Sequence, residues 1–368
     1  MSTLRVEALE QPDGTAFVFN NKNLLINGGM NIFQRSTSAS VSTDTYSTVD
    51  RWKTRVGNQG AFTVSRSTDV PSAQGFGYST KWDCTTADAS PAASDFIVFE
   101  QRIEGQNLQH LLKGTSSAKK LTISFWIKTN KTGTYICELL DFDNTRNISK
   151  SFTISSTSTW EKITLTYDGD TSGTIGNDNG FSFAVMIWLG AGSDFTTGTL
   201  QTSWGTVGTN RATGVVNLAD STSNELYITG IQLEVGSTAS GFEFEPFEAI
   251  LRKCQRYYEK SYEYDTAPGT ATFNGAYYDE VGGTNYPRIQ AHYGVRKRTR
   301  VPTTITVYNP NTGTSGQMFV WDNGASRNYS LGNTAYTFTS VSTEGQNNGF
   351  NLNNRAWGAI HYAADFEL

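Results

Sequence analysis

The chain has 368 residues, of which 17% are charged and 12% are aromatic, and its formal net charge is −5. Disordered chains are rich in charge and poor in aromatic residues, so this composition favours folded domains, and the length suits two or three of them. The mild negative charge gives no general attraction to nucleic acid or to anionic membranes. No run of about 18 apolar residues is present, which excludes insertion of an apolar helix into a bilayer.

Residues 1–22 alternate apolar and polar positions around a turn signal at 11–14. A segment this short cannot bury a core, so we expect either a frayed terminus or an arm that binds another protein. It lacks the basic and apolar regions of a signal peptide, and Cys84, Cys137 and Cys254 form no CxxC pair. We therefore expect synthesis in a reducing cytoplasm.

Residues 23–245 contain many short stretches in which apolar and polar side chains alternate, separated by turns rich in Gly and Asn. The clearest stretches are 121–128, 162–167, 181–188 and 226–233. Each predicts a strand with one apolar face, and helical periodicity is almost absent. This part of the chain is therefore predicted to be a jelly-roll β-sandwich.

Three tryptophans are candidates for ligand contact. Trp126 and Trp188 lie on the strand faces opposite the aliphatic residues, and we place Trp82 by the same alternation. If the aliphatic residues fill the core, these indoles face outward, where a flat ring can stack on a sugar and donate its N–H. The alternative is that a loop or a neighbouring subunit covers each ring.

One helix is predicted, over residues 246–260, because Pro246 suits its first turn and apolar residues recur at helical spacing. Its apolar stripe, spaced 4-3-4, consists of Phe247, Leu251, Cys254 and Tyr258. Such a stripe packs either on a sheet of the same chain or at a contact between two or three subunits.

Residues 261–368 are predicted to form a smaller C-terminal β domain, with strands at 302–308, 336–341 and 356–366. The basic stretch 296–300 is interpreted as a solvated edge strand, or alternatively as a patch for an acidic polysaccharide. The fold class is thus all-β: a jelly-roll sandwich, one helix and a smaller β domain.

No sequence motif predicts catalysis. Glu100, Glu104, Asp141 and Asp143 are candidates, by residue type alone, for the paired carboxylates of a glycosidase. Asp141 and Asp143 also resemble part of a calcium loop, but the downstream Gly and Glu of an EF-hand are absent. We expect these residues to lie in a solvated turn or bulge, and we expect no enzyme activity and no cofactor; whether calcium binds stays open.

Several short motifs resemble, in order, a module found in bacteriophage tail and virion proteins. They are residues 23–30 (NLLINGGM), 33–35 (FQR), 49–52 (VDRW), 121–128 (LTISFWIK), 228–236 (ITGIQLEVG) and 254–258 (CQRYY). The resemblance covers about residues 23–260 and implies a jelly roll similar to carbohydrate-binding modules. Residues 301–310 and 362–365 are similar to the domain that often follows, and residues 2–6 and 13–15 to anchor peptides of some phage fibres.

This resemblance implies a tail fibre or spike subunit in the virion that attaches to the host through a surface polysaccharide. The arm at 1–22 would dock to other virion proteins. The chain would form a homo-oligomer, and the resemblance implies a trimer. The N-L-L, D-R-W and Q-L-E pieces of these motifs are interpreted as framework, with Asp50 and Arg51 paired near Trp52. Two alternatives are a purely structural virion protein (a capsid fibre or tail adaptor) without a ligand, and a glycan depolymerase.

Overall fold

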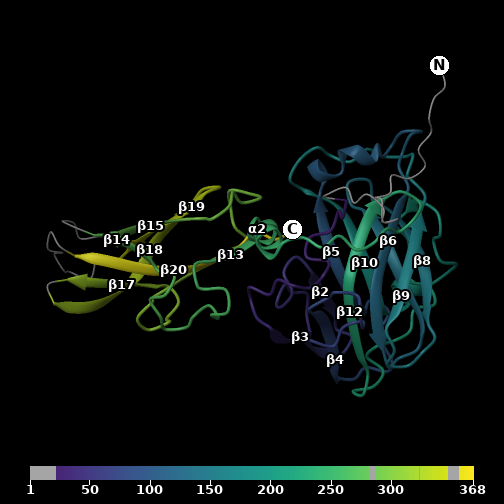
Figure 1. Cartoon of the computed structure of the whole chain (residues 1–368), viewed down its shortest axis with the longest axis horizontal. Coiled ribbons are helices and arrows are strands. Elements are labelled where there is room, and N and C mark those ends of the chain that lie inside the picture. Colours follow the sequence, from purple (N-terminus) through teal and green to yellow (C-terminus); the bar gives the residue numbers. More distant parts are fainter. Residues whose placement is uncertain (1–21, 282–286, 323, 347–355) are drawn as a thin grey trace.

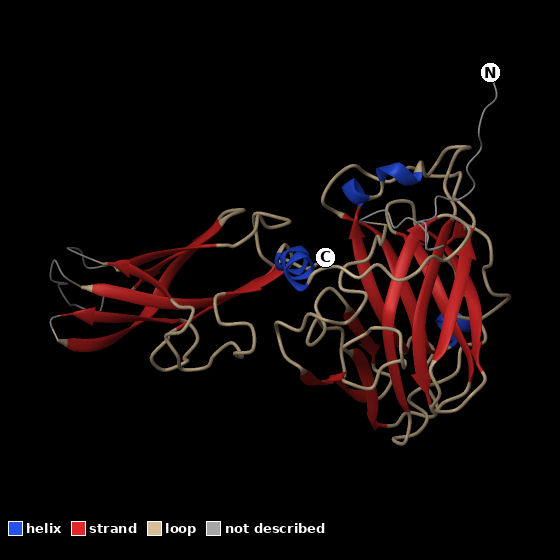
Figure 2. Cartoon of the chain, in the orientation of Figure 1, coloured by secondary structure: helices blue, strands red, loops and turns tan. Residues whose placement is uncertain are grey.

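The computed structural model describes residues 22–281, 287–322, 324–346 and 356–368. The predicted arm at 1–22 lies outside the described residues except for Lys22. Strands dominate the chain, and the C-terminal part projects sideways from a larger β-sandwich (Figures 1 and 2). The prediction of an all-β jelly roll followed by a helix and a smaller β domain is confirmed. No helix in the described part of the chain is long and apolar enough to cross a membrane.

Two antiparallel sheets form the jelly roll. In spatial order, the first sheet comprises β1 (Ser38–Val41), β3 (Ala61–Ser67), β4 (Ser79–Thr86), β12 (Glu225–Val235), β6 (Leu121–Thr129) and β9 (Glu161–Tyr167). The second comprises β11 (Gly205–Thr206), β8 (Arg146–Ile154), β7 (Gly133–Asp141), β10 (Phe181–Ala191), β5 (Phe96–Glu104) and β2 (Lys53–Gly57). Short 3-10 turns, η1 (Gly105–Asn107) and η2 (Gln109–Leu111), follow β5, and α1 (Ser193–Thr196) follows β10.

The core lies between these sheets and is built from the predicted aliphatic stripes. Ile123, Phe125 and Ile127 of β6 are buried there, because alternate side chains of a strand point to the same face. The stripe of β10 is interrupted by a register shift between Phe181 and Phe183. Phe183 enters the core, whereas Phe181 packs on the outer side of the second sheet, which the alternation alone does not predict.

The C-terminal domain is a single eight-stranded sheet in the described part of the chain. Its path is β13 (Tyr258–Lys260), β20 (Trp357–Asp365), β17 (Gln317–Asp322), β18 (Ala325–Tyr336), β19 (Ser340–Gly345) and β15 (Arg288–His292); β14 (Tyr277–Glu280) and β16 (Thr304–Tyr308) also pair with β20. The strand predicted over 336–341 is wrong, since β18 ends at Tyr336 and a turn precedes β19.

The helix is shorter than predicted, and its stripe packs within the chain. α2 spans Phe247–Gln255, so Tyr258 lies in β13 rather than on the helix. Cys254 is buried with Ile32 of the jelly roll, and Leu251 packs on the same cluster. Tyr258 is also buried, while Phe247 remains 45% exposed. Cys254 and Tyr258 therefore cannot form the subunit contact suggested by their spacing, because the jelly roll and the C-terminal domain already cover them.

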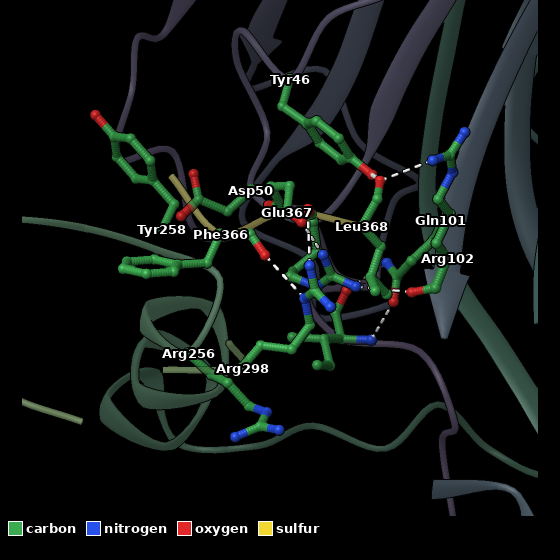
Figure 3. Close-up of polar contacts among 12 residues, drawn as sticks. Tyr46, Asp50, Gln101, Arg102, Arg256, Tyr258, Arg298, Phe366, Glu367 and Leu368 are labelled. Carbon is green, nitrogen blue, oxygen red and sulfur yellow. Dashed lines mark hydrogen bonds and ion pairs between the residues drawn. The ribbon is translucent and has the colours of Figure 1, made fainter. Parts of the chain in front are cut away.

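The last residues of the chain return to the jelly roll and lock the two domains together (Figure 3). Glu367 forms a buried ion pair with Arg51, and Arg102 donates a hydrogen bond of 2.8 Å to the backbone oxygen of Leu368. The Arg51 guanidinium also lies 3.4 Å from the ring centroid of Tyr257, directly after α2. This junction brings together residues that are about 50, 100, 250 and 360 positions along the chain.

Two of the short sequence motifs, residues 33–35 and 49–52, contribute side chains to this junction. Asp50 accepts a 3.0 Å hydrogen bond from the backbone N–H of Gln34 and lies 3.7 Å from Arg35, rather than pairing with Arg51 as expected. Part of the basic stretch 296–300 also belongs here. Arg298 donates to the backbone oxygen of Phe366 at 2.9 Å, so the interpretation of the stretch as a solvated edge strand is wrong.

Candidate functional site

Trp188 faces outward from β10, as predicted, but only 1% of it is exposed. The segment 192–216 folds over this side of the second sheet, and its Phe195 packs against the indole with ring centroids 5.2 Å apart. The indole N–H donates to Glu138 at 2.8 Å, and Arg211 from the same segment forms an ion pair with Glu138 at 2.9 Å. Trp188 therefore cannot stack on a sugar in this conformation, because a loop of the same chain already covers it.

Trp82 is fully buried in the core. Its ring makes edge contacts with Phe62 at 5.5 Å and Phe99 at 5.7 Å, between the two sheets. Its neighbours Lys81 and Asp83, whose side chains lie on the other side of the strand, are partly exposed. The expectation that Trp82 contacts a ligand is therefore corrected: its side of the strand is the inner one.

Trp126 lies on the outer face of the first sheet and is half-buried. It stands directly between Thr229 of β12 and Lys162 of β9 on the neighbouring strands. No residue in the described part of the chain accepts a hydrogen bond from its indole N–H. Of the three predicted tryptophans, Trp126 alone has a ring face and a donor available to a ligand.

Two aromatic residues that were not predicted lie on this outer face. Tyr227 of β12 and Trp160, directly before β9, make an edge contact with centroids 6.4 Å apart. Between them is Lys128, whose Nζ lies 4.5 Å from the Tyr227 centroid and 5.9 Å from the Trp160 centroid. We call Trp126, Trp160, Tyr227 and Lys128 the outer aromatic face.

Polar contacts fix these rings in place. The Trp160 indole N–H donates to Asp69 at 2.9 Å, and Lys128 forms an ion pair with the same carboxylate. Partial burial raises the pKa of Asp69, but the hydrogen bonds from Lys128 and Trp160 lower it by more, so its pKa lies below the ordinary value. On the other side, the Tyr227 hydroxyl donates to Glu225 at 3.0 Å. The side chains are thus pre-oriented before any ligand arrives.

The carboxylates considered for catalysis or calcium binding are each occupied by protein groups. Glu100 pairs with Arg55 at 3.0 Å, and Asp143 accepts a backbone N–H from Gly176 at 2.8 Å. Asp141 pairs with the ammonium group of the buried Lys113.

Glu104 pairs with Arg256 at 2.8 Å. Burial raises the pKa of Glu104. The hydrogen bonds and the positive charge of Arg256, together with the other hydrogen bonds to this carboxylate, lower the pKa by more, so it lies below the ordinary value. In the described part of the chain, no three metal-ligating side chains come together.

A scan against protein-family models and a search of curated proteins gave no match. Several solved structures share a similar arrangement of strands. One is the enzymatically active domain of tailspike protein 4 from bacteriophage CBA120, with 13% identity and a TM-score of 0.31 over 58% of this chain; the match spans only 22% of the tailspike chain. Another is the carbohydrate-binding module TmCBM61 in complex with β-1,4-galactotriose, with 10% identity and a TM-score of 0.30 over 59% of this chain and 100% of the module.

A third similar structure is the family 11 carbohydrate-binding module of a cellulosomal cellulase from Clostridium thermocellum. It is 13% identical, with a TM-score of 0.28 over 55% of this chain and 99% of the module. Similarity this distant does not transfer a ligand or its binding residues to this chain.

Proposed function

We propose that this chain is a subunit of a phage virion fibre or spike that attaches to the host by binding a cell-surface glycan on its outer aromatic face. The observation that carries the proposal is the state of Trp126: a half-buried indole whose N–H has no acceptor among the described residues, beside a second indole that Asp69 holds in place. Aromatic rings of this kind supply a stacking surface and a donor with little loss of side-chain freedom on binding. Lys128 and Lys162 provide further donors to sugar hydroxyls.

The remaining roles follow from the motifs shared with phage proteins. The segment 1–22 would dock the subunit to the particle, and a homotrimer would present several copies of the binding face. Repeated weak sites raise the overall avidity because later binding events become intramolecular. The proposed action is binding without catalysis, which is supported by the pairing of Glu100, Glu104 and Asp141 with cationic side chains.

The test compares Trp126→Ala and Trp160→Ala with the unaltered chain in binding to capsular polysaccharide or lipopolysaccharide purified from a panel of bacteria. Each variant should bind the recognised glycan about tenfold or more weakly, since loss of one stacked ring costs on the order of 1.4 kcal/mol. The matched control is Phe142→Ala, an aromatic residue that is 58% exposed and lies just after β7 of the other sheet.

A purely structural virion protein would bind none of these glycans, and a depolymerase would release reducing ends from them. Unchanged affinity in both tryptophan variants, with the unaltered chain binding normally, would place the glycan elsewhere. Deletion of 1–22 tests the arm separately: the truncated chain should fold and bind glycan but should not join particles.

A further inference from the structure

A second group of aromatic residues lies on β14, β17 and β20 of the C-terminal domain. Figure 1 places the labelled strands β14 and β17 toward the end away from the jelly roll. Tyr278 is 54% exposed and Trp321 is 39% exposed, with the half-buried Trp357 between them. The rings of Tyr278 and Trp357 are 5.6 Å apart. A hollow of about 510 Å³ adjoins them, lined by residues including Asp279, Glu280 and Trp357.

Strand register places these side chains in ordered rows. Across β14, β20, β17 and β18, one row runs Glu280, Trp357, Trp321, Ser326. The row beside it runs Tyr278, Ala359, Phe319, Asn328. Because neighbouring strands are about 4.8 Å apart, four strands give a row about 14 Å long.

These rows lie on the side of the sheet that does not face the domain's core. Ile360 and Val320, the intervening residues of β20 and β17, fill that core. Phe273 covers Phe319 with centroids 5.2 Å apart. Its ring also borders Tyr278 at 6.3 Å and Trp357 at 6.5 Å, while Trp321 stays open beyond it. The alternating pattern therefore leaves a platform of two indoles and a phenol, flanked by a carboxylate, a hydroxyl and an amide.

We propose that this platform, defined by Tyr278, Trp357, Trp321 and Glu280, is a second binding site for a neutral polysaccharide chain. The site uses residues different from those of the outer aromatic face and does not depend on that face binding a ligand. Flat rings match the C–H faces of sugar rings, and Glu280, Ser326 and Asn328 can hydrogen-bond to hydroxyl groups.

The charges select a neutral chain over an acidic one. In the described residues of these four strands, the platform side carries Glu280 but no lysine or arginine. Asp279, on the same strand as Glu280, adds negative charge beside the hollow. Like charges repel, so an acidic polysaccharide would bind less well here.

The size of the platform argues against a second copy of this chain. A Tyr or Trp side chain has on the order of 150–250 Å² of surface, so at these exposures Tyr278 and Trp321 together present on the order of 200 Å². A stable protein interface covers about 800 Å² on each partner. A slender chain of sugars needs far less contact area.

The test is native affinity electrophoresis of the full chain in gels that contain dextran, yeast mannan, galactan or, as the acidic probe, polygalacturonate. At least one neutral polymer should retard the chain, and Trp321→Ala and Tyr278→Ala should each weaken that retardation about tenfold or more. Trp321→Phe keeps a ring and should retain most of it. The control Val301→Ala removes a residue of the same domain that is 56% exposed and lies off the platform.

The double variant Trp126→Ala/Trp160→Ala separates the two sites, because it should leave platform-dependent retardation intact. The proposal is overturned if no neutral polymer retards the chain, if retardation is unchanged in both platform variants, or if polygalacturonate is preferred. It is also overturned if sedimentation velocity shows an oligomer that Trp321→Ala dissociates, because the platform would then be a contact between copies.

Discussion

Trp126 and Trp188 occupy comparable positions in the two sheets of the jelly roll. Each lies on the outward side of a long strand, opposite aliphatic residues that fill the core. Trp126 meets solvent beside other aromatic rings, whereas Trp188 lies beneath the segment 192–216 and hydrogen-bonds to a buried carboxylate. An outward-facing residue is therefore available to a ligand only where no other part of the chain crosses that face.

The same substitution at both positions tests this difference most strongly. Trp188→Ala should lower the free energy of unfolding by about 3–5 kcal/mol, because it leaves a cavity and removes a donor from Glu138. Trp126→Ala, which removes a half-exposed ring, should cost about 1–2 kcal/mol. Urea unfolding of both variants measures the two values. Equal losses would mean that the two faces are covered to the same extent in solution.

Breaking the ion pair between Arg211 of the segment 192–216 and Glu138 of the sheet beneath it should have an intermediate effect on stability. Arg211→Met leaves the buried Glu138 carboxylate with the Trp188 indole as its remaining side-chain donor, which should cost about 2–3 kcal/mol. The segment 192–216 should also become cleavable by protease at lower enzyme concentrations. The matched control is Lys162→Met on the outer face of β9, which should change stability by less than about 0.5 kcal/mol. If Arg211→Met also lowered the free energy of unfolding by less than about 0.5 kcal/mol, the packing of the segment 192–216 on the sheet would not depend on the ion pair.

The smallest effect is expected on the outer aromatic face and depends on pH. The pKa of Asp69 is lower in the folded chain than in the unfolded chain, so the unfolded chain binds more protons in acid. Its contribution to stability is present above about pH 4 and is lost as pH falls through the folded-state pKa. Because the Asp69 side chain is 41% exposed and solvent screens its charge, Asp69→Asn should cost at most about 1 kcal/mol at pH 7.

Urea unfolding of Asp69→Asn and the unaltered chain at pH 7 and near pH 3 checks the sign of this effect. The difference between the two chains should shrink at the lower pH. A difference that grows in acid would contradict the assigned direction of the pKa shift.

Alternation along single strands predicted which residues enter the core, as in Ile123, Phe125 and Ile127 of β6. The prediction placed Trp82 on the wrong side, although the charged neighbours Lys81 and Asp83 alternate with the buried Trp82 and Cys84 and so mark the inner side of the strand. Alternation also carries no information on register. Tyr227 and Lys128 come together only because β12 and β6 pair in one particular way.

The junction shows a further limit of sequence reasoning. The D-R-W motif is interpreted as framework, and its Asp50 and Arg51 are indeed buried and bonded to other parts of the chain. The partner of Arg51, Glu367, however, is separated from it by more than 300 positions, and no local pattern indicates such a pairing. The predicted stripe of α2 failed at Tyr258 for a related reason, since the chain leaves the helix before that residue and continues as β13.

The junction also determines how the C-terminal domain would respond to mechanical force. The chain enters this domain through β13 and leaves it through β20. These strands are antiparallel neighbours, so the start of β13 and the end of β20 lie side by side next to the jelly roll. A pull on the far tip is therefore divided between two attachments, one through α2 and Tyr257 and the other through Glu367. Two attachments prevent the domain from rotating about a single covalent link. A torque applied at the tip is therefore transmitted to the β-sandwich.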